Sequence, residues 1–402
     1  MGRCLVVCDD VSLFLPGDIA RTLILKHISF SIEEGQHIVL TGANGSGKST
    51  LLRLLAGELW PCSGRIAWLG EEGMEESLLT GRSITSLVSP AKQLNYQKHA
   101  WSSSGLDLIL TGLDGTPLLY TAKKREQVEK ARILAASLAC DHLLYRDSSQ
   151  LSQGQLRILL LCRALIREPA LLLLDECLEG LDKAHVERMQ GILEKIAQKT
   201  TICFVTHTDY VPSFCQNDWF MEEGRLVIGQ ERKKVPQPKD KSIVFSHGIM
   251  PEKERKPTTE TSSPLFLLEN ATVFIEGSEV LHSINWRVER GEHWFVGGEN
   301  GSGKSTLLRL LNGDECCACG GKIERFVDDE TEIATLMELR KTISLVSSFG
   351  EVQYDYPVSA LELVCSGFEN SVGLYREYSA DEEALARDLC WRFFDDCSKK
   401  QR

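Results

Sequence analysis

Residues 44–55 read Asn-Gly-Ser-Gly-Lys-Ser-Thr-Leu-Leu-Arg-Leu-Leu, and residues 300–311 repeat the same twelve amino acids. With the glycine two positions earlier, Gly42–Ser49 and Gly298–Ser305 both match the pattern Gly-x-x-x-x-Gly-Lys-Ser. The apolar stretch before each loop predicts a strand, and the leucines after it predict a helix. Glycines let consecutive backbone N–H groups turn toward an anion, and the helix N-terminus adds partial positive charge. The sequence therefore predicts two phosphate-binding loops.

Both loops are predicted to bind nucleotide as ATP with Mg²⁺. Lys48 is expected to reach the β- and γ-phosphates, and Ser49 is expected to hold the metal ion. The candidate nucleotide-binding residues of the two loops are Gly42, Ala43, Asn44, Gly45, Ser46, Gly47, Lys48, Ser49 and Thr50, and Gly298, Glu299, Asn300, Gly301, Ser302, Gly303, Lys304, Ser305 and Thr306.

The repeat extends beyond the loops and divides the chain into two copies of one domain. Ser-Leu-Val-Ser, for example, occurs at both 86–89 and 344–347. Residues 229–264 carry five prolines among charged and hydroxyl side chains, a composition that predicts a flexible linker. We therefore predict a first domain at 1–228 and a second domain at 265–402.

The first copy alternates strand-like and helical patterns. Continuous apolar runs at Ile38–Thr41, Leu171–Leu174 and Ile202–Thr206 suit strands that are buried on both faces. This alternation predicts an α/β fold with a largely parallel sheet. Residues 94–149 lack such runs and contain a charged helical stretch, so we predict a helical insert there.

Composition and charge argue against several classes of protein. The 402 residues carry a formal net charge of −12, which disfavours tight binding to a nucleic-acid backbone. No apolar run approaches the ~20 residues that cross a bilayer, and the first residues lack the pattern of a signal peptide. Cysteines in apolar segments, such as Cys162, Cys177 and Cys203, suit free thiols in a reducing cytosol. We expect a cytoplasmic protein that meets a membrane only as a peripheral subunit on its inner face.

Four further motifs in the first copy indicate a family. Leu151–Gln155 reads Leu-Ser-Gln-Gly-Gln and resembles the Leu-Ser-Gly-Gly-Gln signature of ABC (ATP-binding cassette) ATPases, with Gln153 in place of the first glycine. Leu171–Glu176 resembles a Walker B strand followed by the catalytic glutamate. The D-loop and the switch histidine have their counterparts at Glu179–Asp182 and at Thr206-His207. The resemblance implies a P-loop NTPase cassette: a parallel-sheet core with a helical subdomain.

The resemblance also implies a role for each of these residues. Asp175 would hold the Mg²⁺ shell, Glu176 would polarise the attacking water, and His207 would contact the γ-phosphate. The signature residues would face the ATP of an opposite cassette from a helix N-terminus; these are Ser152, Gly154 and Gln155. ATP would then join two cassettes, and hydrolysis would release them.

Five positions keep two interpretations each. Gln93 is either the lid glutamine that reaches Mg²⁺ or a residue outside that pattern. Phe14 either stacks on adenine or belongs to the core. Gln155 and Arg157 are either functional or plain helix-surface residues. His207 is either the switch or a core histidine at a strand end.

Three segments narrow the resemblance: the Ser-Leu-Val-Ser phrase at 86–89 and 344–347, the similar stretches at 106–112 and 361–367, and Phe368–Tyr375. They resemble the ModF type of tandem ABC ATPases, which are associated with molybdenum transport. This implies an ATP hydrolase that energises a transporter, with membrane permease subunits supplied by partner chains and with molybdate or another oxyanion or metal as cargo. A second signature would fall beyond Arg402, so we expect activity to need a homodimer of first copies or a partner cassette. The alternatives are a soluble switch protein in regulation or repair, and a nucleotide-binding remnant with little turnover.

Overall fold

The computed structural model describes most of the chain. The described residues are 2–14, 22–98, 103–148, 151–179, 181, 183–206, 211–229, 264–275, 277–298, 301–326, 333, 335–346, 358–369 and 376–393. The chain divides into two compact units, residues 1–247 and 248–402. The division falls within the predicted linker 229–264, nearly all of which lies outside the described residues.

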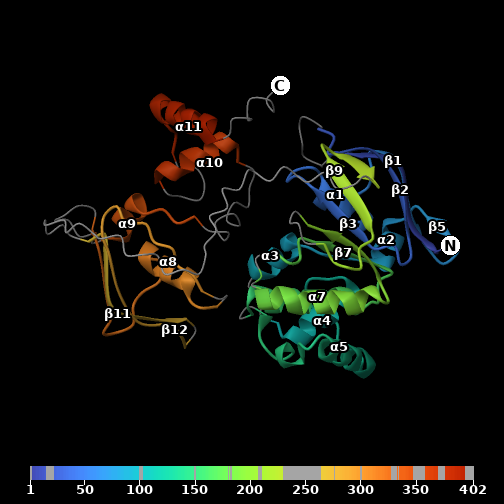
Figure 1. The fold of residues 1–402 in the computed structure, drawn as a ribbon, viewed down its shortest axis with the longest axis horizontal. Helices are drawn as coiled ribbons and strands as arrows, with labels where there is room; N and C mark the ends of the chain where they lie inside the picture. Colours follow the sequence, from blue (N-terminus) through green and yellow to red (C-terminus); the bar gives the residue numbers. More distant parts are fainter. Residues whose placement is uncertain are drawn as a thin grey trace. The chain divides into compact units, whose positions relative to one another are not determined.

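Unit 1 contains two sheets and the helices that cover them (Figure 1). Its strands are β1 (Cys4–Leu13), β2 (Leu25–Glu33), β3 (Ile38–Gly42), β4 (Ser63–Leu69), β5 (Met74–Glu75), β6 (Thr85–Val88), β7 (Leu171–Asp175), β8 (Thr201–Val205), β9 (Asn217–Glu222) and β10 (Arg225–Ile228). Its helices are α1 (Lys48–Leu55), α2 (Leu78–Ile84), α3 (Pro90–Lys98), α4 (Gly105–Asp114), α5 (Arg125–Ser137), the short 3-10 helix η1 (Asp141–Leu143), α6 (Gln153–Leu165) and α7 (Lys183–Ala197).

A six-stranded sheet in the order β10-β9-β3-β8-β7-β6 forms the centre of unit 1. Its five strands from β9 to β6 run parallel, and β10 is an antiparallel edge strand. Every residue of β7 and β8 is buried, as expected for strands covered on both faces. The predicted strands and the predicted α/β fold are therefore confirmed. Because β3 and β7 both flank β8, the loops that follow them open at the same edge of the sheet.

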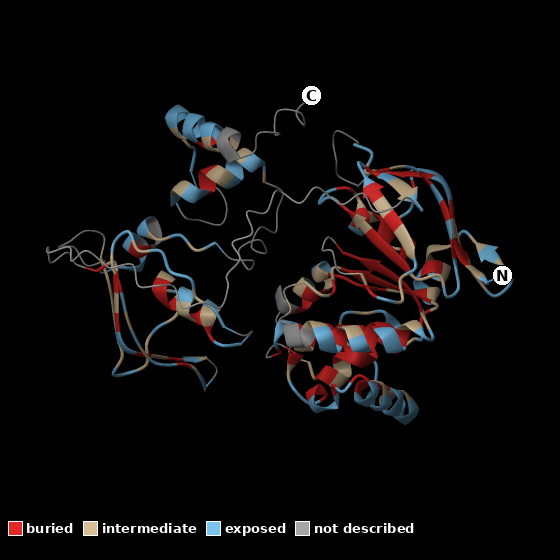
Figure 2. Ribbon diagram, in the orientation of Figure 1, coloured by how far each residue is buried: buried red, intermediate tan, exposed pale blue. Residues whose placement is uncertain are grey.

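The two faces of this sheet belong to two separate cores. Along β7, Leu171 and Leu173 pack with α1 and the antiparallel sheet β2-β1-β4-β5. The alternate residues Leu172 and Leu174 pack instead with α4, α5, α6 and α7. Figure 2 colours the residues by burial; buried residues make up nearly all of the central strands β3, β8 and β7, while the edge strand β10 has only exposed and half-buried residues. Helices α3, α4 and α5 fall in the predicted helical insert 94–149, with α3 beginning slightly before it.

Helix α6 lies deep in this helical layer. Ten of its residues are buried, and they cover most of its circumference. Helix α4 packs against it, and the two helix backbones come close together at Gly112 of α4. A Cβ atom on Gly112 would lie 2.1 Å from the carbonyl oxygen of Arg163, so only glycine allows the two backbones to approach this closely.

Unit 2 has a smaller sheet in the order β12-β11-β13. Its strands are β11 (Phe266–Ile275), β12 (Ser278–Val288) and β13 (Lys322–Arg325), and its helices are α8 (Lys304–Asn312), α9 (Leu336–Thr342), α10 (Ala360–Ser366), η4 (Gly367–Glu369) and α11 (Ala380–Phe393). Residues of β11 and β12 pack against the buried face of α8, which includes Leu310 and Leu311.

The prediction of a strand before the second glycine loop is wrong. Residues 292–298 form no strand, and Phe295 is 82% exposed. In unit 1 the matching strand, β3, pairs with β8 on one side and β9 on the other. Within the described part of unit 2 the sheet is antiparallel and does not include 292–298. An apolar pattern cannot hold an extended backbone without neighbouring strands to accept and donate its hydrogen bonds.

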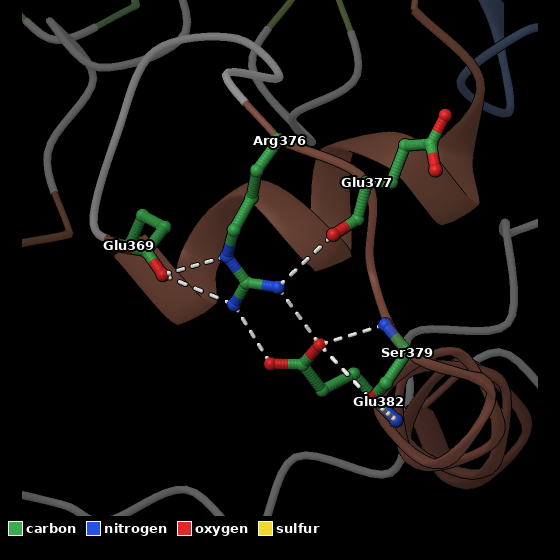
Figure 3. Close-up of polar contacts among 5 residues, drawn as sticks. All are labelled: Glu369, Arg376, Glu377, Ser379 and Glu382. Atoms are coloured by element: carbon green, nitrogen blue, oxygen red, sulfur yellow. Dashed lines mark hydrogen bonds and ion pairs between the residues drawn. The ribbon is translucent and has the colours of Figure 1, made fainter.

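A cluster of charges joins the helices near the end of unit 2 (Figure 3). The Arg376 guanidinium donates to Glu369 in η4 at 3.0 Å and to both carboxylate oxygens of Glu382 in α11, at 2.9 and 2.7 Å. Glu382 also accepts hydrogen bonds from the backbone N–H and the hydroxyl of Ser379. These partners lower the pKa of Glu382 to about 2, led by the hydrogen bond from Arg376.

Candidate functional site

The first glycine loop joins β3 to α1 at the carboxyl edge of the parallel sheet. Gly47 precedes the helix in the left-handed conformation, with a φ of 106°. Gly42 has a φ of 146°, and a Cβ atom there would lie 2.3 Å from the carbonyl oxygen of Met221. The loop can therefore turn this tightly only with glycine at position 42. The turn leaves the first N–H groups of α1 at its open end, where helices attract anions.

The side of the loop that faces outward is accessible. Ala43, Asn44, Gly45 and Ser49 are exposed, and Thr50 is half-buried. Ser46 is buried, and its Oγ has no hydrogen-bond partner.

Lys48 is held over the loop. Its Nζ donates to the carbonyl oxygens of Gly42 at 2.8 Å and Ala43 at 3.0 Å, and the residue is buried. Burial lowers the pKa of Lys48, and the charges of Glu176, Asp175 and Glu179 oppose that shift. The lysine is thus an ammonium donor already placed beside the loop, with carboxylates close enough to favour its charged form.

Asp175 ends β7, one strand away from the loop strand β3 across β8. It is 6% exposed, and its Oδ1 has no hydrogen-bond partner. Burial raises the pKa of this carboxyl, while a hydrogen bond from Ser49 lowers it, and the charges of Glu176 and Lys48 act in opposite directions. A buried carboxylate oxygen without a partner is costly, and a hard cation is a fitting ligand for it. Ser49 and Asp175 therefore fit a Mg²⁺ ion as an oxygen pair.

Glu176 follows Asp175 directly and adopts a φ of 49°. Its backbone N–H donates to the carbonyl oxygen of Val205 at the end of β8, at 3.2 Å. This left-handed conformation costs on the order of 1 kcal/mol for a residue other than glycine, and such strain concentrates at functional sites. The strand end thus places a half-buried carboxylate close enough to Lys48 to influence its pKa.

The signature-like segment begins α6 with a reciprocal cap. The Ser152 hydroxyl accepts a hydrogen bond from the Gln155 backbone N–H at 3.3 Å, and the Gln155 Oε1 accepts one from the Ser152 N–H at 3.1 Å. Gly154 is buried in the first turn. Gln155 is half-buried and is a capping residue rather than a plain surface residue.

Gln93 and Arg157 meet below this helix start. The Gln93 Oε1 accepts a hydrogen bond from the Arg157 Nε at 3.0 Å, and its Nε2 donates to the Gln153 carbonyl oxygen at 3.5 Å. Arg157 is buried, so its interpretation as a helix-surface residue is wrong. The signal for its burial is local: it stands in the apolar run Leu156–Leu161, and a charge inside such a run requires buried partners. The role of Gln93 as a metal ligand stays a prediction.

The remaining predicted residues of the first copy are Phe14, Thr206 and His207. Phe14 follows β1, is half-buried, and donates its backbone N–H to the Cys62 Sγ at 3.5 Å. Thr206 follows β8 and donates its N–H to the Leu40 carbonyl oxygen at 3.2 Å. His207 lies outside the described residues.

The second glycine loop has the same local geometry as the first. Gly303 precedes α8 in the left-handed conformation, with a φ of 88°, and Gly298 has a φ of 156°. The Lys304 Nζ donates to the Gly298 carbonyl oxygen at 2.7 Å, as Lys48 does to Gly42. The other residues of this loop divide by exposure: Gly301, Ser302 and Ser305 are exposed and Thr306 is buried, while Glu299 and Asn300 lie outside the described residues.

Two glycine loops, a buried aspartate followed by a half-buried glutamate at a strand end, and a capped signature-like helix together define a nucleotide-binding cassette protein. The family model described as ABC transporter matches residues 25–179 and 281–389, which is more than half of the chain. The chain belongs to the ABC transporter family. Both glycine loops, Asp175 and Glu176 lie within the matched ranges.

Similar proteins include three ATP-binding proteins, two of which are named for what they import. The ABC transporter ATP-binding protein ModF of Escherichia coli K12 is 28% identical over 382 residues, covering 92% of this chain and 76% of its own length. The molybdate/tungstate import ATP-binding protein WtpC of Pyrococcus horikoshii is 31% identical, covering 56% of this chain and 63% of its own length. The nickel import ATP-binding protein NikE of E. coli K12 is 31% identical, covering 59% of this chain and 90% of its own length. In the part of this chain that the structure describes, no helix is both long and apolar enough to cross a bilayer.

Proposed function

We propose that unit 1 binds ATP with Mg²⁺ and hydrolyses it, and that the protein is the ATP-binding component of a membrane importer. The observation that carries the proposal is the grouping of Lys48, Ser49, Asp175 and Glu176 at one edge of the parallel sheet. Lys48 and the loop N–H groups bind the β- and γ-phosphates, and Lys48 exchanges its carbonyl partners for phosphate oxygens. Bound by Ser49 and Asp175, Mg²⁺ supplies positive charge that neutralises the phosphates. Glu176 accepts a hydrogen bond from the attacking water and orients it toward the γ-phosphate.

The proposed catalytic cycle uses two cassettes. The resemblance of Leu151–Gln155 to the ABC signature supports a second cassette, from another copy of this chain or from a partner, that contributes its signature helix to ATP bound at Lys48. The residues that face the partner's nucleotide are then Ser152, Gly154 and Gln155, and His207 contacts the γ-phosphate from the same cassette as Lys48. The cargo that we propose is an oxyanion such as molybdate, or a metal ion, supported by the similarity to WtpC and NikE. Permease subunits supply the membrane path.

The catalytic part is tested by phosphate release from the full chain over a range of protein concentrations. Glu176→Gln should lower kcat by about 10²–10⁴-fold, the usual contribution of a positioned base, while ATP still binds. Lys48→Ala should abolish ATP binding itself, as read from a fluorescent ATP analogue. The rate per chain should rise with concentration if cassettes pair. Equal phosphate release by the wild type and Glu176→Gln would contradict the proposal.

The transport part is tested by reconstitution. The tagged chain is co-expressed with candidate permeases, and complexes that co-purify are placed in vesicles. Molybdate with its binding protein should stimulate ATP hydrolysis, with nickel as the comparison. ATP hydrolysis without any permease that binds the chain would favour a soluble switch protein instead.

A further inference from the structure

One arginine joins three elements around the acid loop, which we define as residues 176–179. Arg157 lies in the second turn of α6 and is 8% exposed. Its Nε donates to the Gln93 Oε1 in α3 at 3.0 Å. Its Nη1 donates to the carbonyl oxygens of Cys177 and Glu179 at 3.1 and 2.5 Å. Helices α3 and α6 and the acid loop therefore meet at a single guanidinium.

The acid loop needs such support. Glu176 starts it in an unfavourable left-handed conformation, with a φ of 49°. A hydrogen bond from the Glu176 N–H to the Val205 carbonyl oxygen joins the loop to the sheet, and another from the Glu179 N–H to the Glu176 carbonyl oxygen closes its turn. Both are 3.2 Å long. Arg157 holds the part of the loop that follows the carboxylate, at Cys177 and Glu179.

We propose that Arg157 is a positioning residue that fixes the Glu176 carboxylate for hydrolysis and couples its position to α3 and α6. This rests on the proposed function of Glu176 as the group that orients water. The planar guanidinium has several N–H donors in a fixed geometry, so it can donate to the Gln93 Oε1 and to the carbonyl oxygens of Cys177 and Glu179 at the same time. A lysine keeps the charge at this position but presents a single ammonium, so the loop loses part of its support. Removing the charge altogether frees the three acceptors without a replacement donor.

The first experiment compares Arg157→Lys with Arg163→Lys in the full chain. Arg163 is a matched control: it lies on the same helix, but it donates to the Thr111 Oγ1 in α4 at 2.8 Å and to the Thr116 carbonyl oxygen just after α4 at 2.9 Å, and not to the acid loop. Arg157→Lys should lower kcat by about 10–100-fold, as a small displacement of a catalytic group does, with an unchanged KM for ATP. Arg163→Lys should leave kcat unchanged, and melting curves of both variants report whether the fold is retained.

The second experiment needs no turnover. Hydrogen exchange of the Glu176 and Glu179 amides is measured in the wild type, in Arg157→Gln and in Arg163→Lys. Faster exchange in the acid loop of Arg157→Gln alone supports the proposal. If the wild type hydrolyses no ATP, the proposed function fails, and this measurement still decides whether Arg157 holds the loop. Unchanged loop exchange, or an Arg157→Lys variant with normal kcat, overturns the proposal; should Arg157→Gln fail to fold, Arg157→Lys is measured in the same way.

Discussion

Replacing Asp175 by asparagine should stabilise the nucleotide-free protein while it removes the response to Mg-ATP. Asp175 is 6% exposed, and its Oδ1 has no hydrogen-bond partner. Burial raises its pKa in the folded protein, so the folded state binds this proton more tightly than the unfolded state does. At neutral pH the carboxylate is charged, and its charge therefore lowers the free energy of unfolding. Asparagine has nearly the same shape, keeps an oxygen for the Ser49 hydroxyl and carries no charge.

The size of the effect follows from these contacts. An unsatisfied buried polar group costs about 1–3 kcal/mol, and more when it is charged. The substitution also weakens the field that keeps Lys48 protonated, although Glu176 and Glu179 still contribute to it. We expect a net gain of about 1 kcal/mol, which raises the Tm of a domain of this size by about 2–4 °C.

Differential scanning calorimetry checks this with and without Mg-ATP. Wild-type unit 1 should gain about 2.7 kcal/mol when ATP is present at one hundred times its Kd, and Asp175→Asn should gain much less. The advantage of the variant in the absence of nucleotide should shrink as pH falls through the raised pKa of the folded carboxyl, and it should vanish below about 3.9, the ordinary pKa of aspartate, because the wild type is then protonated in both states. A nucleotide-free variant that melts below the wild type at neutral pH would refute the argument about the buried charge.

Three further predictions concern other parts of the molecule. Gly42→Ala should abolish ATP binding and lower the Tm, because the new Cβ would lie 2.3 Å from the Met221 carbonyl oxygen; fluorescent ATP binding and calorimetry check it. Trp68→Phe should destabilise unit 1 by about 2–4 kcal/mol in urea titrations, because the buried Nε1 donates to the Leu55 carbonyl oxygen at 2.9 Å and the smaller ring leaves a void. The pKa of Glu382 is lowered to about 2 in the folded protein, so its carboxylate stabilises unit 2 against unfolding. This stabilisation is complete above the ordinary pKa range of glutamate and is lost as pH falls through about 2. Hydrogen exchange of α11 along an acid titration should show this loss in the wild type and not in Glu382→Gln.

The sequence predicts what depends on local pattern. The glycines at 42 and 47 determine a turn whose backbone angles follow from the residue type, and the apolar runs at 171–174 and 202–206 are long enough to indicate buried strands. Local pattern does not predict which distant segments contact one another. The apolar run Leu156–Leu161 indicates that Arg157 is buried, but its acceptors lie in α3 and in the acid loop, far from it in sequence, so the pattern does not identify them. Residues 292–298 carry a strand-like pattern, but a parallel strand exists only where neighbours pair with it.

The close approach of α4 and α6 has a mechanical consequence. Ordinary helix pairs are separated by a layer of side chains that can change rotamer and absorb a small displacement. At Gly112 that layer is missing, because the α4 backbone rests directly on the Arg163 carbonyl group. Because no side chain can give way at this point, we expect a displacement of α4 to move α6 with it, and the capped turn at Ser152 begins that helix.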